Sequence, residues 1–213
     1  APYFKNVSFS MNKGDKVFLY SKHSIITSKL YQVLNGEIEA DSGTFEWGIT
    51  INHAYLPNHN DEYFTSTLSL VNWLRQYSEE KDETFIRGFL GKMLFSGDEA
   101  LKQCNVLSGG EKVRCMISRL MLANPNMLML DEPLNHLDLE SITAFNNSLQ
   151  DYKGSVLFTS HDHHFIQSIA DRVLEIGPGG VVDKPTDYDG YREDKELLER
   201  REEVYKGLNI ESI

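Results

Sequence analysis

The sequence has little cysteine, no long apolar run and no excess of basic residues, and each shortage excludes a class of protein. Cys104 and Cys115 are the only cysteines in 213 residues, too few for the disulfide framework of small secreted domains. No apolar run approaches the roughly 20 residues that a membrane-spanning helix requires. The first residues also lack the basic and apolar regions of a signal peptide. We therefore expect a cytoplasmic protein that does not insert into a membrane.

Basic residues are outnumbered by acidic ones. The chain has 21 Lys and Arg against 32 Asp and Glu, which gives a formal net charge of −11. Because nucleic-acid partners normally require a basic face, we do not expect this segment to be wrapped in nucleic acid, although a local basic patch is compatible with the composition. Hydrophobic residues make up 40% of the chain, enough for the core of one domain.

Strand and helix patterns divide the chain into three zones. Up to about residue 57, short strands surround one helix that ends at Asn35 and Gly36. Residues 61–105 carry apolar residues at helical spacing and predict a helical subdomain. From Leu107 onward, short apolar runs alternate with helices, as in an α/β layered core with buried parallel strands. The expected strands cover residues 3–9, 17–20, 43–47, 51–56, 127–130, 155–158 and 173–176, and the expected helices cover residues 28–34, 67–77, 83–95, 110–122, 139–149 and 164–169.

These zones suggest one main domain and a tail. The strands at 43–47 and 51–56, joined through Gly48, predict a hairpin near the start of the chain. We place the main domain over residues 1–190 and a charged, helical tail over residues 191–213, which we expect to be a solvated face rather than a binding element. The start at a strand-like segment suggests that the chain is a fragment.

Two carboxylates follow the buried strand at 127–130. Asp131 and Glu132 are expected at the C-terminal edge of the sheet, where ligands of such sheets bind. An aspartate there can hold Mg²⁺, usually through water, and a glutamate can polarise an attacking water. A strand that merely ends at an acidic turn explains the two residues equally well.

A glycine pair opens the helix that begins near residue 110. In Leu107-Ser108-Gly109-Gly110-Glu111, the glycines free backbone N–H groups to face an anion, and the helix dipole adds attraction. An ordinary capping box of Ser108 and Glu111 is the structural alternative, and both can be true at once. His161 follows the next buried strand and, beside a carboxylate pair, could bind a γ-phosphate.

Four motifs stand in the order in which ABC ATPases carry them. The run Glu132–Asp138 resembles the EPTNHLD stretch of the ABC-F subfamily, with Leu134 where Thr is common, and Asp187–Tyr191 is similar to the end of such a cassette. ABC-F proteins are soluble twin-cassette ATPases without membrane domains that typically act on the ribosome. The four motifs are Leu107–Glu111, Asp131–Pro133, Asn135–Asp138 and Ser160–Asp162.

The resemblance implies an α/β fold of the P-loop NTPase class: an ABC-type cassette with a RecA-like core, an antiparallel β subdomain and a helical subdomain. By the same comparison the chain is one cassette, the second of a twin-cassette protein. The first strand, with the adenine-stacking aromatic residue, is expected upstream of Ala1.

The resemblance places the phosphate loop at residues 21–28, where the family pattern fails. The expected pattern, G-x-x-G-x-G-K-[ST], uses glycines so that backbone N–H groups cradle phosphate and a lysine that reaches the β and γ oxygens. A β-branched residue at a glycine position resists positive φ and crowds the backbone against a ligand. Ser21, Ser24 and Ile26 stand at the glycine positions, Thr27 stands at the lysine position, and Ser28, the expected Mg²⁺ hydroxyl, is retained.

Loss of the lysine predicts weak nucleotide binding. A charge-assisted contact to phosphate is worth about 1.5–3 kcal/mol, so its loss weakens ATP binding by about one to two orders of magnitude. Lys22 and Lys29 flank the gap, but neither occupies the lysine position. We expect negligible turnover by the chain alone.

The family's composite site assigns a role to each motif. ABC cassettes pair head to tail, so the resemblance implies that Ser108, Gly109, Gly110 and Glu111 complete the ATP site of a partner, either the other cassette of the same chain or a homodimer mate. Glu132 and His161 would be catalytic at the chain's own site. The cofactors implied are ATP and Mg²⁺. The nucleotide-binding residues implied are Ser21, Lys22, Ser24, Thr27, Ser28, Asn58, Asp131 and Asp138, of which Ser28, Asn58 and Asp131 would hold Mg²⁺.

Three functions fit this sequence. The leading hypothesis is an ATPase half that needs its partner cassette for turnover and acts on the ribosome. The second is a pseudo-ATPase that serves as a dimerisation or ribosome-docking module, which the altered loop supports and the retained Glu132 and His161 oppose. The third is the cassette of a membrane transporter, which the Asn135–Asp138 run disfavours.

Overall fold

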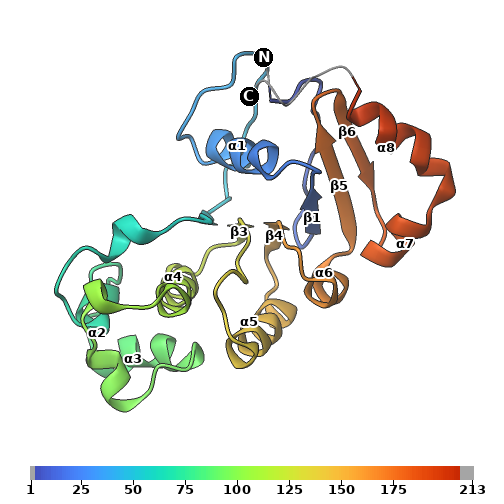
Figure 1. Cartoon of the computed structure of the whole chain (residues 1–213). Coiled ribbons are helices and arrows are strands. Elements are labelled where there is room, and N and C mark those ends of the chain that lie inside the picture. Colours follow the sequence, from blue (N-terminus) through green and yellow to red (C-terminus); the bar gives the residue numbers. More distant parts are fainter. Residues whose placement is uncertain (1–2, 207–213) are drawn as a thin grey trace.

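Six strands form one mixed sheet. The computed structural model describes residues 3–206 (Figure 1). The strand order is β2-β3-β4-β1-β5-β6, and every neighbouring pair is parallel except β5 and β6, which are antiparallel. The carboxyl ends of β2, β3, β4 and β1 therefore meet at one edge. The strands are β1 (Lys16–Tyr20), β2 (His53–Leu56), β3 (Met127–Leu130), β4 (Ser155–Phe158), β5 (Arg172–Gly177) and β6 (Gly180–Lys184).

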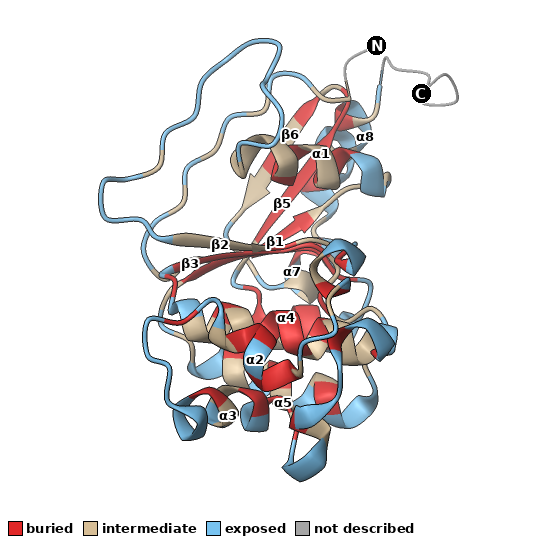
Figure 2. Ribbon diagram, turned by 90° about the vertical axis from the view of Figure 1, so that its left-hand side faces the viewer, coloured by how far each residue is buried: buried red, intermediate tan, exposed pale blue. Residues whose placement is uncertain are grey.

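Helices cover both faces of the sheet, whose central strands are buried (Figure 2). Val17 and Leu19 of β1 pack in one core cluster with Ile26, Leu30 and Tyr31 of α1. The alternate strand positions belong to a second, larger cluster that includes residues of α4, α5 and α6. This double burial explains why the strands are short, continuous apolar runs. The α-helices are α1 (Ser24–Leu34), α2 (Leu70–Arg75), α3 (Glu83–Lys92), α4 (Gly109–Ala123), α5 (Leu139–Asp151), α6 (His163–Ile169), α7 (Tyr188–Glu193) and α8 (Leu198–Val204).

The zone predicted as helical contains α2, α3 and three short 3₁₀ segments, η1 (Asp61–Phe64), η2 (Gly97–Leu101) and η3 (Cys104–Val106). Trp73 is fully buried, and its ring stacks on Phe64 at a centroid distance of 4.7 Å. Both cysteines are free and buried, and burial raises the pKa of the Cys115 thiol well above its usual value. The interpretation of Cys115 as a small buried hydrophobic residue is thus confirmed.

The prediction of a hairpin over residues 43–56 is wrong. Residues 43–47 form no strand, and β2 pairs in parallel with β3 instead of folding back on a neighbour. Residues 3–9 also form no strand. An antiparallel β subdomain is therefore not formed by residues 3–52 of this structure. A β edge needs a partner strand to satisfy its backbone, and local alternation alone did not supply one here.

The charged segment from Tyr191 is not simply a solvated face. Tyr191 is fully buried, and Leu197 and Val204 are nearly so. Helix α8 lies against β6 at the outer end of the sheet (Figure 1). Residues 207–213 of the expected tail lie outside the described residues, and the domain boundary near residue 190 stays a prediction.

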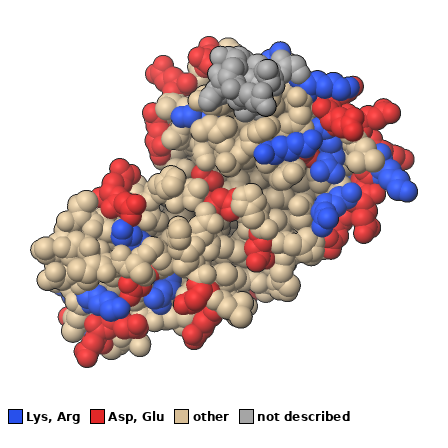
Figure 3. Space-filling view, in the orientation of Figure 1, with Lys and Arg blue, Asp and Glu red and all other residues tan. Residues whose placement is uncertain are grey.

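Charges of both signs share the surface. Acidic and basic side chains are interspersed on the face shown in Figure 3, without a continuous basic patch on that face. In the part of the chain that the structure describes, no helix is both long and apolar enough to cross a membrane.

Candidate functional site

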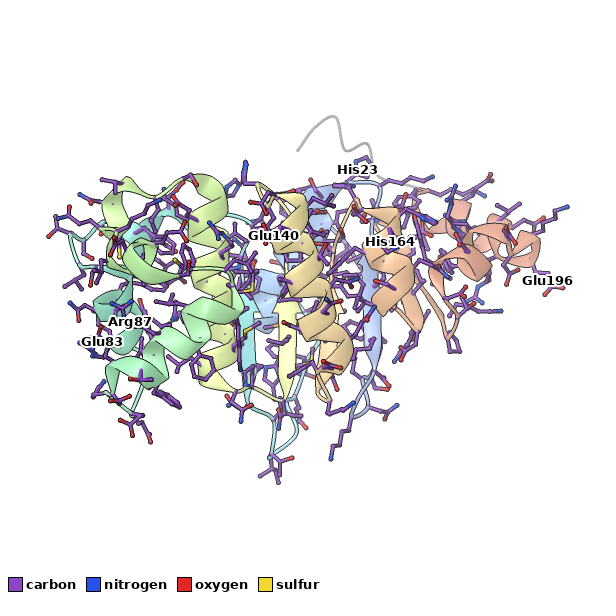
Figure 4. The ribbon with its side chains drawn as sticks, turned by 90° about the horizontal axis from the view of Figure 1, so that it is seen from below. His23, Glu83, Arg87, Glu140, His164 and Glu196 are labelled. Carbon is purple, nitrogen blue, oxygen red and sulfur yellow. The ribbon has the colours of Figure 1, made fainter. Side chains whose placement is uncertain are left out.

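The predicted catalytic residues lie where the central strands end. Asp131 and Glu132 directly follow β3, Thr159 directly follows β4, and Ser28 reaches the same place from α1. Figure 4 shows His23, Glu140 and His164, at the starts of α1, α5 and α6, toward one side of the molecule, while Glu83 and Glu196 lie at opposite ends. The sheet thus gathers the N-termini of three helices near one edge.

The Asp131 carboxylate is held by two hydroxyl groups. Ser28 Oγ donates to Asp131 Oδ2 at 2.8 Å, and Thr159 Oγ1 donates to Asp131 Oδ1 at 3.0 Å. Burial raises the pKa of the Asp131 carboxyl, while the bonds from Ser28 and Thr159 lower it in part. A buried carboxylate beside a serine hydroxyl offers the hard oxygen ligands that Mg²⁺ prefers. Ser28 and Asp131 therefore fit the predicted magnesium site.

Glu132 faces His161 at this edge. His161 Nε2 lies 3.3 Å from Glu132 Oε1, with the histidine side chain 86% exposed and the glutamate 13% exposed. Burial raises the pKa of the Glu132 carboxyl, and the facing His161 lowers it in part. Glu132 also has a positive φ of 50°, a strained conformation for a residue with a side chain. The two residues predicted as catalytic are thus brought together.

Thr159 is a site residue that sequence reasoning missed. Its hydroxyl accepts the backbone N–H of Glu132 at 2.9 Å while it donates to Asp131. It is almost fully buried. One side chain directly after β4 therefore bonds to both carboxylate-bearing residues after β3. Its position two residues before His161, at the end of a predicted strand, was the available signal.

The segment predicted as the phosphate loop is largely helical. Helix α1 begins at Ser24, so two predicted glycine positions and the lysine position belong to its first turn. Ile26 is 1% exposed and Thr27 is 4% exposed, and Thr27 Oγ1 donates to the Ser24 carbonyl at 2.8 Å. Their side chains and backbone are used by the fold. The segment therefore lacks both the glycine backbone and the lysine charge with which the family pattern holds phosphate.

Helix α4, which we call the signature helix because it begins within the Leu107–Glu111 motif, starts with a side-chain cap. Ser108 Oγ accepts the N–H of Glu111 at 3.3 Å, and Glu111 Oε2 accepts the N–H of Ser108 at 2.9 Å, which confirms the capping box. Lys102 holds the Glu111 carboxylate at 2.6 Å. The N–H groups of Gly109 and Gly110, at the first two positions of the helix, have no helical acceptor. They fit an anion.

Close packing requires a glycine at position 110 and leaves little room for a side chain at Gly109. A Cβ atom at Gly110 would lie 2.4 Å from the carbonyl oxygen of His136, and one at Gly109 would lie 3.3 Å from its side chain. His136 has a φ of 67°. The start of α4 therefore rests directly on the loop that follows Glu132.

The remaining predicted residues have structural partners. Asn58 accepts a hydrogen bond from the Asn135 side chain at 2.9 Å, and among residues 3–206 no hydrogen bond joins Asn58 to Ser28 or Asp131. Asp138 caps α5 by accepting the N–H of Ser141 at 2.8 Å, and this bond lowers the pKa of Asp138. The ligand roles predicted for Asn58 and Asp138 stay predictions.

The chain is similar to known ATP-binding proteins along most of its length. It is 55% identical over 202 residues to the uncharacterized ABC transporter ATP-binding protein YkpA of Bacillus subtilis, a match that covers 94% of this chain and 37% of that protein. It is 30% identical over 212 residues to ABC transporter F family member 5 of Arabidopsis thaliana, which covers 98% of this chain and 30% of that protein. The chain thus spans about a third of the length of these relatives.

A solved structure shares the fold. The dimeric post-hydrolysis structure of the ATP-binding cassette MJ0796, bound to ADP and Pi, matches with a TM-score of 0.67 at 16% identity, over 85% of this chain and 90% of that one. The family model described as ABC transporter matches residues 4–135, more than half of the chain. The chain therefore belongs to the ABC transporter family, as one of its ATP-binding cassettes.

Proposed function

We propose that this cassette works as one half of an ABC-F-like ATPase and contributes mainly through its signature helix. In this account Ser108, Gly109 and Gly110 complete an ATP site whose phosphate loop belongs to a partner cassette. The partner is the second cassette of a longer chain or a second copy of this one. The pair acts in the cytoplasm and couples ATP binding and hydrolysis to an action on the ribosome.

The observation that supports this proposal most strongly is that the first backbone N–H groups of α4 have no acceptor within the helix. The capping box orders the helix end through side chains and leaves the N–H groups of Gly109 and Gly110 for a ligand. The helix dipole and two adjacent donors favour a phosphate oxygen. The matching fold of a cassette whose structure is dimeric supports a paired arrangement.

The chain's own site is proposed to bind nucleotide weakly. Ser28 and Asp131 supply magnesium ligands, and Glu132 with His161 supply the catalytic pair. Asn58 and Asp138 complete this proposed site. Bound Mg²⁺ would neutralise phosphate charge there. Because Ile26 and Thr27 stand where the family pattern has a glycine and the phosphate-binding lysine, we infer slow or no turnover at this half.

The early start of α1 also favours a second candidate, a pseudo-ATPase. In that account the chain never binds ATP at residues 21–28 and serves as a dimerisation or ribosome-docking module. The cassette of a membrane transporter is less favoured, since similarity to an F family member along 98% of this chain supports the ABC-F assignment. The ribosomal role rests on that resemblance. Pelleting with ribosomes separates it from binding to a membrane permease.

The test mixes the chain with the proposed partner cassette, expressed as a separate polypeptide, and measures ATP hydrolysis. We expect the chain to raise the partner's rate at least about 10-fold, the effect of about 1.4 kcal/mol of transition-state stabilisation. Gly109→Asp, which puts a negative charge at the proposed phosphate contact, is expected to abolish the stimulation. Gly88→Asp is the matched control, because Gly88 lies on α3 with open space around it. Equal stimulation by both variants contradicts the proposal.

Calorimetric titration of ATP–Mg²⁺ into the chain alone separates the two candidates. Binding weaker than micromolar that remains measurable, and that persists in Glu132→Gln, supports the weak site. Absence of heat up to millimolar ATP supports the pseudo-ATPase, in which the chain only donates its signature helix.

A further inference from the structure

The residue that follows α8 contacts the segment that precedes α1. Tyr205 Oη accepts the backbone N–H of Lys22 at 3.1 Å and donates to the Ile176 carbonyl at 3.4 Å. The Lys22 ammonium lies over the Tyr205 ring, 4.4 Å from its centroid. The His23 ring meets the same ring edge-on at 6.2 Å. One side chain from the end of α8 therefore holds both the amide and the charge of Lys22.

The turn between β5 and β6 is shaped to receive this end of α8. A Cβ atom at Gly177 would lie 2.6 Å from Val204 Cγ1 and 2.9 Å from Tyr205 Cε1. A Cβ atom at Gly179 would lie 2.9 Å from the Glu203 carbonyl oxygen. The N–H of Gly179 donates to the Val204 carbonyl at 2.8 Å. The close approach of the end of α8 to the β5–β6 turn thus depends on Gly177 and Gly179, which lie far from α8 in the sequence.

A buried ion pair anchors the same helix. Glu175 of β5 is 0% exposed and accepts hydrogen bonds from Arg201 Nε at 2.8 Å and from Tyr191 Oη at 2.6 Å. Glu175 pairs in register with Tyr20, the last residue of β1. The anchor therefore lies beside the strand that leads into residues 21–23.

We propose that α8 with Tyr205 is a built-in latch that occupies Lys22 and so competes with nucleotide phosphates for the start of the altered loop. Lys22 is the nearest cation in sequence to the missing lysine on the strand side of the loop. While Tyr205 holds it, its charge faces an aromatic ring instead of a ligand. Undocking of α8 frees the amide and the ammonium together. This inference rests on the proposed function only in placing phosphates at residues 21–28.

Hydrogen exchange of the Lys22 amide tests the contact directly. Without nucleotide, we expect protection in the wild-type chain and at least about 10-fold faster exchange in Tyr205→Phe, which keeps the ring but removes the acceptor. Glu199→Ala, an exposed position on α8, is the control and is expected to leave exchange unchanged. Equal exchange in wild type and Tyr205→Phe overturns the latch.

Titration with ATP–Mg²⁺ tests the competition. Tyr205→Ala is expected to bind ATP about 2- to 5-fold more tightly than wild type, the size of one exposed cation–π contact, and adding Lys22→Ala is expected to cancel the gain. Gly177→Ala places its new Cβ against Val204 and the Tyr205 ring, which displaces the end of α8 while leaving Lys22 unchanged, and it is expected to give the same gain. Absence of a gain in Tyr205→Ala, or a gain that survives Lys22→Ala, overturns the proposal. Both assays use the chain without a partner, so neither outcome bears on the signature helix.

Discussion

Two helix N-termini carry the residues predicted to meet nucleotide phosphates, and the chain treats them differently. At the start of α4, a capping box orders the helix and leaves the N–H groups of two glycines at its first positions. At the start of α1, the N-cap His23 makes no side-chain capping bond among the described residues, and the helix extends through the predicted loop. The two starts therefore differ in their side chains: α4 begins with a capping box and two glycines, whereas α1 begins without a side-chain cap from the described residues and has Ile26 and Thr27 where the family pattern has a glycine and a lysine.

The largest effect is expected from removing the anchor of α8. Arg201→Ala leaves the fully buried Glu175 carboxylate with Tyr191 as its remaining partner, and loss of one partner of a buried pair costs about 3–5 kcal/mol. Urea denaturation measures the loss. Arg201→Lys, which keeps the charge, is the control and is expected to lose less. A cost below about 1 kcal/mol would mean that the ion pair does not hold α8 in place.

The second-largest effect is expected from adding a methyl group at the start of α4. In Gly110→Ala the new Cβ meets the backbone of His136, and overpacking of this kind costs about 1–3 kcal/mol. The loop after Glu132 is expected to shift as well, with loss of the chain's effect on its partner cassette. Gly88→Ala on α3, with nothing near its Cβ position, is expected to stabilise the chain by about 0.5–1 kcal/mol. Thermal denaturation and partner-stimulated hydrolysis compare the two.

Restoring the family pattern at the other helix tests the contrast from the opposite direction. Ile26→Gly with Thr27→Lys returns a flexible position and the phosphate-binding charge, and is expected to tighten ATP binding about 10- to 100-fold. Because Ile26 is buried against the sheet, the variant is also expected to be less stable. Calorimetric titration gives the affinity. An unchanged affinity would mean that the loop sequence is not what limits binding.

Removing the N-cap hydroxyl of α4 and adding one to α1 tests the difference between the two helix starts, with a smaller expected effect. Ser108→Ala removes a capping hydroxyl from α4 and is expected to cost about 1 kcal/mol. His23→Ser supplies a capping hydroxyl to α1, which lacks one among residues 3–206, and is expected to stabilise the chain by up to about 1 kcal/mol. Urea midpoints measure both. The same sign of change for the two variants would contradict the account.

The pH dependence around Asp131 is the smallest effect. Burial raises the pKa of this carboxyl above its usual 3.8, so the folded chain binds the proton more readily than the unfolded chain. Stability is therefore expected to fall as pH rises from about 3.8 to the raised pKa of the folded state. Asp131→Asn lacks this titration, so the stability difference between it and wild type should change across that window. A constant difference would mean that Asp131 keeps an ordinary pKa.

The sequence predicted correctly those strands and helix caps that depend on residues within a single short segment. The apolar runs that became β3, β4 and β5 and the capping box at Ser108 were found from the sequence because burial on two faces and a helix cap leave local signatures. The motif order brought Asp131, Ser28, Glu132 and His161 to one place, as the family resemblance implied.

Contacts between distant segments could not be predicted in this way. The alternation of apolar and polar residues at 43–47 is typical of a strand, but a strand needs a paired neighbour. The neighbouring strand β2 pairs with β3 instead. Ile26 in the first turn of α1 packs in one core cluster with residues of β1 and β5, which the local pattern does not show. Thr159 and Tyr205 carry no motif, and their roles come from partners more than 20 residues away. The glycines at 177 and 179 gain meaning only once α8 is seen against them.

The most direct test of the contrast is hydrogen exchange of the two helix starts with ATP–Mg²⁺ and the partner cassette present. The account predicts that ATP slows exchange at the amides of Gly109 and Gly110, while exchange of residues 22–28 stays close to that of the nucleotide-free chain. Strong protection of residues 22–28 with no change at Gly109 and Gly110 would contradict it, because phosphates would then be held by the loop and not by the signature helix.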